Sequence, residues 1–199
     1  MTSERIVSLE TRDAQFPLES GAGTDAVHSG SEYAFATTLL ATANGMFGTG
    51  IALTLGRGNQ LVCEAAEMLG ASLVGREIGD LMANFGGVSR QLAQDPQLRW
   101  LGPHKGVVHL ALASLTNACF DLWAKARGLP LWRLLLDLTP RQVVDLLDLS
   151  YLEYVLAPEE ALKILVEHSR GRFAPEAVLR KPIRATTPQW DGSITKTRG

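Results

Sequence analysis

Residues 100–140 read WLGPHKGVVHLALASLTNACFDLWAKARGLPLWRLLLDLTP, and this stretch decides the helical part of the fold. Between residues 106 and 126 the side chains are apolar on nearly every side, which predicts one long helix buried in a core. Its few polar positions follow a four-residue spacing, at His109, Asn117, Asp121 and Lys125, with Ala113 at the position between the first two. Such spacing places them in one narrow stripe, and Asp121 followed by Lys125 is the favourable order for an i,i+4 ion pair.

The same stretch contains its own helix ends. Gly128 is the residue type that favours the position just past a helix, and Pro130 favours the first turn of the next one. The sequence Thr139-Pro140-Arg141-Gln142 predicts a capping box, with Thr139 as the cap and the Gln142 side chain reaching back. Residues 130–138 therefore continue the apolar surface after a sharp stop and restart.

Upstream of this helix the pattern changes to strands. Residues 6–14 alternate loosely, while residues 33–42 and 46–55 are two β-prone runs that flank Asn44-Gly45. An Asn-Gly turn between such runs is a strong hairpin signal. Residues 60–73 and 77–92 are predicted helices, with Asn59 as the cap of the first and an interruption at Gly86-Gly87 in the second. The predicted fold class is α+β, a three-stranded antiparallel meander followed by a helical bundle.

Composition describes an ordinary soluble chain. Hydrophobic residues make up 46% and charged residues 20% of the 199 positions. Cys63 and Cys119 lie in apolar helical contexts, which favours buried thiols over a disulfide or a metal pair. The N-terminus has no apolar signal region, and no apolar run of about 18 residues is present. We therefore expect a cytoplasmic protein with no membrane partner.

The charge distribution divides the chain at about residue 168. Residues 169–199 carry seven Lys/Arg against two Asp/Glu, a net charge of +5, whereas residues 1–168 have a net charge of −7. With three prolines and few periodic apolar positions, residues 169–199 are predicted to be a divergent, basic, disordered tail. Its cations could contact phosphates, but no nucleic-acid motif accompanies them, so only weak, salt-sensitive binding is expected.

A set of longer motifs follows in order along residues 4–168. They are Thr24-Asp25-Ala26-Val27-His28, Tyr33, TLGRGN (54–59), QLRWLGP (97–103), KGV (105–107), Asn117-Ala118, DLWAK (121–125), Pro130-Leu131-Trp132 and PEEAL (158–162). With these motifs the chain resembles the N-terminal capping domain of the enolase superfamily, in its mandelate racemase/muconate lactonizing branch and most closely its L-fuconate dehydratase group. His104 and Ala157 depart from the group's Glu and Thr; a lost cap costs about 1 kcal/mol.

The resemblance implies an acid-sugar dehydratase chemistry. In this superfamily a base removes the proton α to a carboxylate, and Mg²⁺ stabilises the enediolate. The resemblance places the bases, the metal ligands and a His–Asp pair on a barrel that follows the cap. Such a barrel takes about 200 residues, and 31 residues follow His168. We therefore expect no catalytic residue and no Mg²⁺ ligand on this chain, and predict that it is inactive alone.

The final segment also lacks the family's K-x-K motif and any visible resemblance to it. The sequence therefore predicts that the reading frame departs from the ancestral one near Arg170.

The resemblance assigns substrate contacts to Gly23, Thr24, Asp25 and Tyr33. Glycine permits close backbone approach, while the hydroxyl and carboxylate side chains suit recognition of a polyol acid. The alternative is that Thr24-Asp25 only forms a turn. Gly56-Arg57-Gly58 lacks the spacing of either nucleotide-binding glycine motif.

Two functions remain open. One is a truncated dehydratase relative with specificity loops and no catalytic machinery. The other is a non-catalytic interaction module, whose exposed apolar surface binds a separate barrel domain or another copy of the chain.

Overall fold

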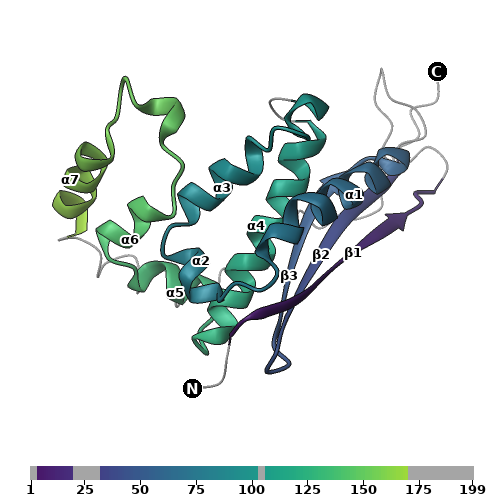
Figure 1. Ribbon diagram of the computed structural model, residues 1–199, viewed down its shortest axis with the longest axis horizontal. Helices are drawn as coiled ribbons and strands as arrows, with labels where there is room; N and C mark the ends of the chain where they lie inside the picture. Colours follow the sequence, from purple (N-terminus) through teal and green to yellow (C-terminus); the bar gives the residue numbers. More distant parts are fainter. Residues whose placement is uncertain (1–3, 20–31, 103–105, 170–199) are drawn as a thin grey trace, which may run out of the picture.

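The computed structural model describes residues 4–19, 32–102 and 106–169. These residues form an antiparallel sheet with helices on one face and further helices beyond it, which confirms the α+β prediction (Figure 1). The sheet has the order β1-β2-β3 and contains β1 (Ile6–Phe16), β2 (Tyr33–Thr42) and β3 (Phe47–Thr54). The first strand runs two residues past its predicted end.

The predicted Asn44-Gly45 hairpin is present. Gly45 has φ of 83°, the left-handed region in which glycine has no steric cost. The Thr42 N–H donates to the Met46 carbonyl oxygen at 2.9 Å and closes the turn. Along β2 every second residue is buried, so one face of the sheet is turned toward the helices and the other is not.

The helices follow in chain order and agree in outline with the sequence. They are α1 (Asn59–Gly70), α2 (Ile78–Met82), α3 (Phe85–Ala93), α4 (Val107–Ala126), α5 (Leu131–Asp137), α6 (Pro140–Asp145) and α7 (Pro158–Ser169), with short 3₁₀ turns such as η1 (Gly56–Gly58). The predicted helix over residues 77–92 is interrupted, as expected, but between Met82 and Phe85 rather than at Gly86-Gly87. Gly86 lies within α3, at a position where a Cβ would meet the Leu147 carbonyl oxygen, so the close packing there requires a glycine.

Helix α4 is the core helix that the sequence predicts. It packs on β3, on α1 and on the helices beyond (Figure 1). Gly48 and Gly50 of β3 face it, and a Cβ built on Gly50 would lie 1.9 Å from the Ser114 carbonyl oxygen. The Ser114 hydroxyl is buried and lies 2.8 Å from the hydroxyl of Thr38 on β2. The glycines therefore allow the helix backbone to lie directly on the strand.

By length and composition alone, α4 is long and apolar enough to cross a membrane, although the sequence was expected to contain no such segment. In the most apolar 18 residues of this helix, 56% are buried inside the described structure. Its buried residues contact the sheet and neighbouring helices, as expected for the core helix of a globular domain.

Three residues of the polar stripe of α4, Asn117, Asp121 and Lys125, lie along the outer edge of β3. The Lys125 Nζ donates to the Phe47 carbonyl oxygen at 3.0 Å, and the amide of Asn117 donates to the Ile51 carbonyl oxygen at 3.0 Å. Four helical residues rise about 6.0 Å and two strand residues about 6.8 Å, so the two repeats stay in step. The predicted stripe is thus the cover of an otherwise open sheet edge.

The helix ends near residue 130 and the capping box are confirmed. Gly128 has φ of 63°, and the Leu129 N–H donates to the Ala124 carbonyl oxygen at 3.0 Å. Thr139 accepts from the Gln142 N–H, and the Gln142 side chain accepts from the Thr139 N–H. Pro130 is the residue just before α5 rather than its first residue.

Helices α6 and α7 form a small cluster of their own, away from the sheet (Figure 1). Its buried apolar residues are Val144, Leu149 and Ala161. Ala161 is the buried residue of α7, whereas Ile164 and Val166 are 43% and 46% exposed. This helix is therefore attached to the body through a narrow contact. Residues 170–199, including most of the predicted tail, lie outside the described residues.

Candidate functional site

One end of the sheet brings together three chain segments that are far apart in the sequence. Phe16 at the end of β1 lies opposite Tyr33 at the start of β2, and Ala34 lies opposite Thr54 at the end of β3. Residues 17–32 connect β1 to β2 at this end. Gly23, Thr24 and Asp25 belong to the part of this connection, residues 20–31, that lies outside the described residues. Of the four predicted substrate contacts, the structure places Tyr33.

Tyr33 is accessible at this end of the sheet. Its side chain is 43% exposed, and that of Phe16 is 53% exposed. The Phe16 ring packs edge-to-face on Phe35, with centroids 5.7 Å apart. An exposed phenol beside an aromatic pair can donate or accept one hydrogen bond while its ring faces an apolar part of a ligand.

The turn after β3 lies against the start of β2. Gly56 has φ of 70°, and an added Cβ would lie 3.3 Å from the Glu32 carboxylate. The next residue, Arg57, is exposed and forms no ion pair within residues 4–19, 32–102 and 106–169. The sheet end therefore presents a phenol, a carboxylate and a guanidinium from two separate segments.

Beneath this end lies a buried polar junction centred on Asn59. The Thr54 hydroxyl donates to Asn59 Oδ1 at 2.5 Å and lies 3.3 Å from the Ala34 carbonyl oxygen. Asn59 Nδ2 donates to Asp13 Oδ1 on β1 at 2.5 Å. The prediction that Asn59 caps α1 is wrong: the helix begins at Asn59, with Gly58 in the cap position and no side-chain cap bond.

Asn59 is the residue of this end that the sequence did not reveal. Its place after Gly58 and before an apolar helical pattern is typical of a cap, and its partner Asp13 is 46 residues away. Thr54 is five residues from Asn59 in the sequence, whereas Asp13 reaches the Asn59 side chain only because β1 pairs with β2.

The two cysteines are buried thiols, as predicted. Burial raises the pKa of Cys119 to about 12. Burial, helped by the negative charge of Asp13, also raises the pKa of Cys63. Neither thiol has the lowered pKa of a nucleophile or metal ligand.

No group of three or more metal-binding side chains occurs in the part of the chain that the structure describes. Mg²⁺ requires several oxygen ligands in an octahedral arrangement. At the sheet end, Asp13 Oδ1 already accepts a hydrogen bond from Asn59. The described residues do not fit a resident magnesium ion.

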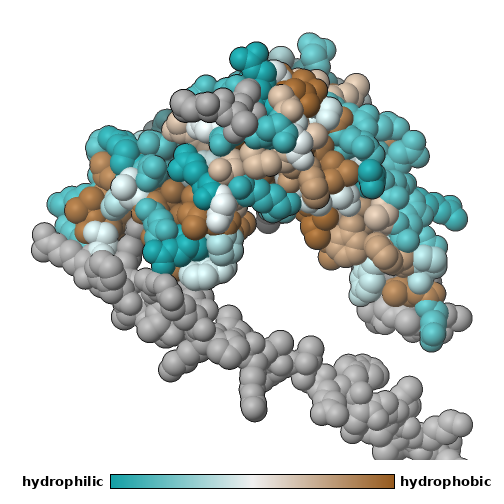
Figure 2. All heavy atoms as spheres, turned by 90° about the horizontal axis from the view of Figure 1, so that it is seen from below, coloured by the Kyte–Doolittle hydropathy of each residue, from teal (hydrophilic) through white to brown (hydrophobic). Residues whose placement is uncertain are grey.

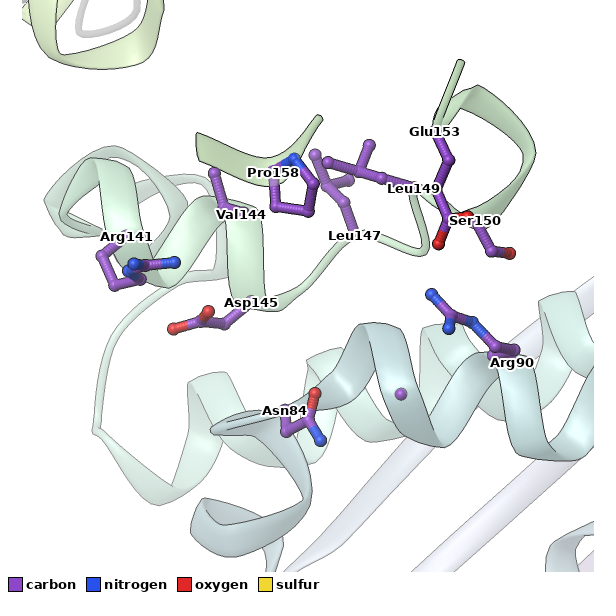
Figure 3. A pocket seen from close by; sticks show the side chains of 11 residues that line it. Asn84, Arg90, Arg141, Val144, Asp145, Leu147, Leu149, Ser150, Glu153 and Pro158 are labelled. Carbon is purple, nitrogen blue, oxygen red and sulfur yellow. The ribbon is translucent and has the colours of Figure 1, made fainter. Parts of the chain in front are cut away.

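A cavity of about 330 Å³ with a mixed polar and apolar lining lies at the opposite end of the molecule, between α3 and the segment from α6 to α7 (Figure 3). Its two arginines are both paired with carboxylates: Arg90 with Asp148 at 2.8 Å and Arg141 with Glu159 at 3.1 Å. Burial alone would raise the pKa of Asp148, but hydrogen bonding from Ser150 and the Arg90 guanidinium outweigh it and lower that pKa. Because both arginines are already paired with carboxylates, we interpret this cavity as a gap between packed helices rather than as an anion-binding site.

A second cavity, of about 430 Å³, is mainly apolar and lies among α3, α4, α5 and α6. Its lining residues include Phe85, Phe120, Leu135, Leu138 and Leu146. It shares no residue with the sheet end and supplies two hydroxyls, from Ser89 and Thr116, as polar groups.

The face of the sheet that points away from α1 and α4 carries exposed apolar side chains, beside the exposed Glu10–Arg12 ion pair of β1. Five of its side chains are 43–55% exposed: Phe16, Tyr33, Phe47, Ile51 and Leu53. Figure 2 shows the molecule hollowed between the sheet and the α6–α7 region, with apolar residues on the walls of the hollow. Trp132 and Leu135 of α5 add further exposed apolar area. An apolar surface of this kind marks an interaction site.

Comparison with known proteins gives one family match and several long relatives. Residues 8–135 match the family described as mandelate racemase/muconate lactonizing enzyme, N-terminal domain. "Mitochondrial enolase superfamily member 1" of Bos taurus is 43% identical over 198 residues, covering 96% of this chain and 45% of that protein. "L-galactonate dehydratase" of Hypocrea jecorina is 39% identical over 190 residues, covering 94% of this chain and 42% of that protein.

The crystal structure of human mitochondrial enolase superfamily member 1 superposes with a TM-score of 0.83 at 41% identity. The superposition covers 89% of this chain and 41% of the human chain. A mandelate racemase/muconate lactonizing enzyme from Polaromonas sp. JS666 shares the fold at 23% identity, with a TM-score of 0.53. The chain thus spans a little under half the length of the relatives it matches.

These matches correct one expectation about residues 170–199. The bovine match leaves 4% of the 199 residues uncovered, about eight, so most of this 30-residue segment is aligned. The expectation that the segment lacks any resemblance to the family is wrong for most of its length. The premise for a changed reading frame near Arg170 is removed with it.

Proposed function

The chain belongs to the mandelate racemase/muconate lactonizing enzyme family through its N-terminal domain, and from this we propose that it forms the substrate-specificity half of an acid-sugar dehydratase. The proposed substrates are sugar acids of the L-fuconate and L-galactonate type. Support comes from the 39% identity to a protein named L-galactonate dehydratase and from the motifs shared with the L-fuconate dehydratase group.

One observation carries the proposal: the convergence of separate segments at a single sheet end. Phe16 and Tyr33 flank the connection 17–32, and Gly56 of the turn after β3 lies against Glu32. Two loops that close one end of a sheet can surround a ligand, while the sheet itself keeps their bases fixed. Of the residues proposed to contact the substrate, Tyr33 lies at this end, whereas Gly23, Thr24 and Asp25 belong to the part of the connection 17–32 that lies outside the described residues.

The residues at this end suit recognition rather than bond breaking. The phenol of Tyr33 can bind a substrate hydroxyl, and the exposed guanidinium of Arg57 can attract a carboxylate. In the family's chemistry Mg²⁺ stabilises the enediolate that forms when the α-proton is removed. Within the described ranges there is no base–metal constellation for that step, so the proposed function assigns it to a barrel domain outside those ranges.

A direct assay tests this division of labour. The purified chain, supplied with L-fuconate or L-galactonate and Mg²⁺, is expected to give no 2-keto-3-deoxy acid above the rate without protein. Product formation by the chain alone, persisting through a second purification step and abolished by Tyr33→Phe, would show that the catalytic groups are present here and would refute the proposal.

The exposed apolar surface favours a second role, as a docking module. We propose that the open sheet face and α5 pack against a barrel domain, and that isolated copies associate through the same surface. Phe47, Ile51, Leu53 and Trp132 are the exposed residues that carry this proposal. Sedimentation of the purified chain should show self-association that Ile51→Asp and Leu53→Asp reduce. A monomer that binds no hydrophobic dye would contradict it.

A further inference from the structure

We propose that Asn59 is a positioning residue that holds the three strand ends and the η1 turn in one fixed arrangement at the sheet end. The effect on ligand recognition rests on the proposed function, whereas the positioning itself does not. Asn59 is 0% exposed, and its amide joins elements that are separated by 46 residues of sequence.

These hydrogen bonds form a network that involves all three strands of the sheet. It begins at Asp13 on β1 and passes through both ends of the Asn59 amide to the Thr54 hydroxyl on β3. That hydroxyl has one proton, which is directed to Asn59, so the Ala34 carbonyl oxygen on β2, at 3.3 Å, is a second and weaker acceptor for it. Every strand therefore contributes one group. Tyr33 directly precedes Ala34, and Arg57 stands two residues before Asn59. Both proposed recognition groups are therefore within two residues of a group in this hydrogen-bond network.

An amide side chain can satisfy both the Thr54 donor and the Asp13 acceptor at this junction. Its oxygen accepts from the Thr54 hydroxyl while its nitrogen donates to the Asp13 carboxylate. A carboxylate at position 59 would lie 2.5 Å from that of Asp13 with no proton between them. An apolar residue would leave the buried Thr54 hydroxyl without this acceptor, which costs more than a solvated group would.

The arrangement predicts that exchanging the side chains of positions 13 and 59 restores the hydrogen bonds that Asn59→Asp alone breaks. In Asp13→Asn/Asn59→Asp the donor and the carboxylate trade places. The carboxylate at position 59 accepts from Thr54 with one oxygen and from the amide at position 13 with the other. A residue with a merely space-filling role would gain nothing from this exchange.

The test is amide hydrogen exchange on the purified chain, comparing residues 32–36 and 55–60 with the hairpin residues 42–46. Asn59→Asp should raise exchange about tenfold or more in the first two segments, the consequence of losing a charge-assisted bond. The double variant should return both segments to within about threefold of the unchanged chain. Asn44→Ala, at the opposite end of the sheet, should affect only the hairpin.

Two results would overturn the inference. One is an Asn59→Asp effect spread evenly over the sheet or confined to α1; the other is a double variant no better protected than the single one. If Asn59→Asp does not fold, Asp13→Ala leaves the Thr54 bond in place and should raise exchange at residues 14–16 and 33–34 alone; no change there would equally refute the inference. Since no substrate is used, this test can fail while the proposed function stands, and the reverse also holds.

Discussion

The carboxylate of Asp121 on α4 accepts a hydrogen bond from the backbone N–H of Thr49 at 2.8 Å while it pairs with Lys125 at 2.7 Å. Thr49 lies on the outer edge of β3, where no fourth strand is present among the described residues. A helix thus occupies the position of a neighbouring strand and pairs part of the open edge. The same contact fixes how far along the sheet α4 lies, and with it the core.

Removing this contact should cost more than removing an ordinary surface ion pair. Asp121→Ala leaves the Thr49 N–H without its acceptor, and we expect a loss of about 1–3 kcal/mol in the free energy of unfolding. The control is Asp137→Ala, which removes the i,i+4 partner of Arg133 on α5 and should cost about 0–1 kcal/mol. Equal losses in urea titration would mean that the strand contact contributes nothing.

The close approach of α4 to β3 predicts an intolerant glycine. A methyl group on Gly50 would lie 1.9 Å from a helix carbonyl oxygen, so Gly50→Ala must push the helix away. We expect a loss of at least about 3 kcal/mol, or failure to fold. Gly79→Ala meets no atom within 4 Å inside α2 and should be neutral or stabilising by up to about 1 kcal/mol. A mild Gly50→Ala variant with unchanged unfolding midpoint would contradict the packing described.

The raised pKa values of the two thiols predict slow modification of the folded chain. At pH 8, Cys119 with a pKa of about 12 is almost wholly protonated and enclosed, and burial also raises the pKa of Cys63. A chromogenic disulfide reagent should therefore titrate both thiols at once in urea and neither promptly in buffer. Rapid native reaction of Cys119, identified by peptide mapping, would be inconsistent with its burial.

Acid should weaken the attachment of the α6–α7 region. The pKa of Asp148 is lowered in the folded chain, so its pairing with Arg90 stabilises the fold above the unfolded value, 3.8. That stabilisation is lost as pH falls through the lower native pKa. The stability difference between the unchanged chain and Arg90→Gln should be constant from pH 5 to 7 and shrink below about pH 4. A difference that grows on acidification would reverse the assignment.

Arg141→Gln serves as the matched control for that experiment. Its pair with Glu159 is mostly exposed, at 52% and 75% of the two side chains. Exposed pairs contribute little, so this variant should follow the unchanged chain at every pH.

Local patterns predicted most of the architecture because their causes are local. The Asn44-Gly45 turn, the end of α4 at Gly128 and the capping box at Thr139 each depend on residues within one turn of chain. The spacing of Asp121 and Lys125 predicted their pairing for the same reason. The spacing of these residues does not predict which surface the stripe contacts, which is the edge of β3.

The candidate site was less predictable because its causes are long-range. Asn59 has the sequence context of a cap, and only the fold brings Asp13 to it. Position 86 of α3 requires a glycine because the backbone of Leu147, some sixty residues later, packs against it. The substrate contacts were expected from a resemblance rather than from physical chemistry, and of these Tyr33 is the one that lies within the described residues.

The central claim is that this chain supplies specificity to an acid-sugar dehydratase, and a chimera tests it most directly. Residues 1–169 would replace the matching part of the Hypocrea jecorina L-galactonate dehydratase, and kcat/KM would be measured for L-fuconate and L-galactonate. We expect turnover with a changed substrate ratio. Tyr33→Phe should lower kcat/KM about tenfold, and Tyr154→Phe, which alters a fully exposed phenol, should leave it unchanged. An active chimera with the parent's substrate ratio and no effect of Tyr33→Phe would contradict the account.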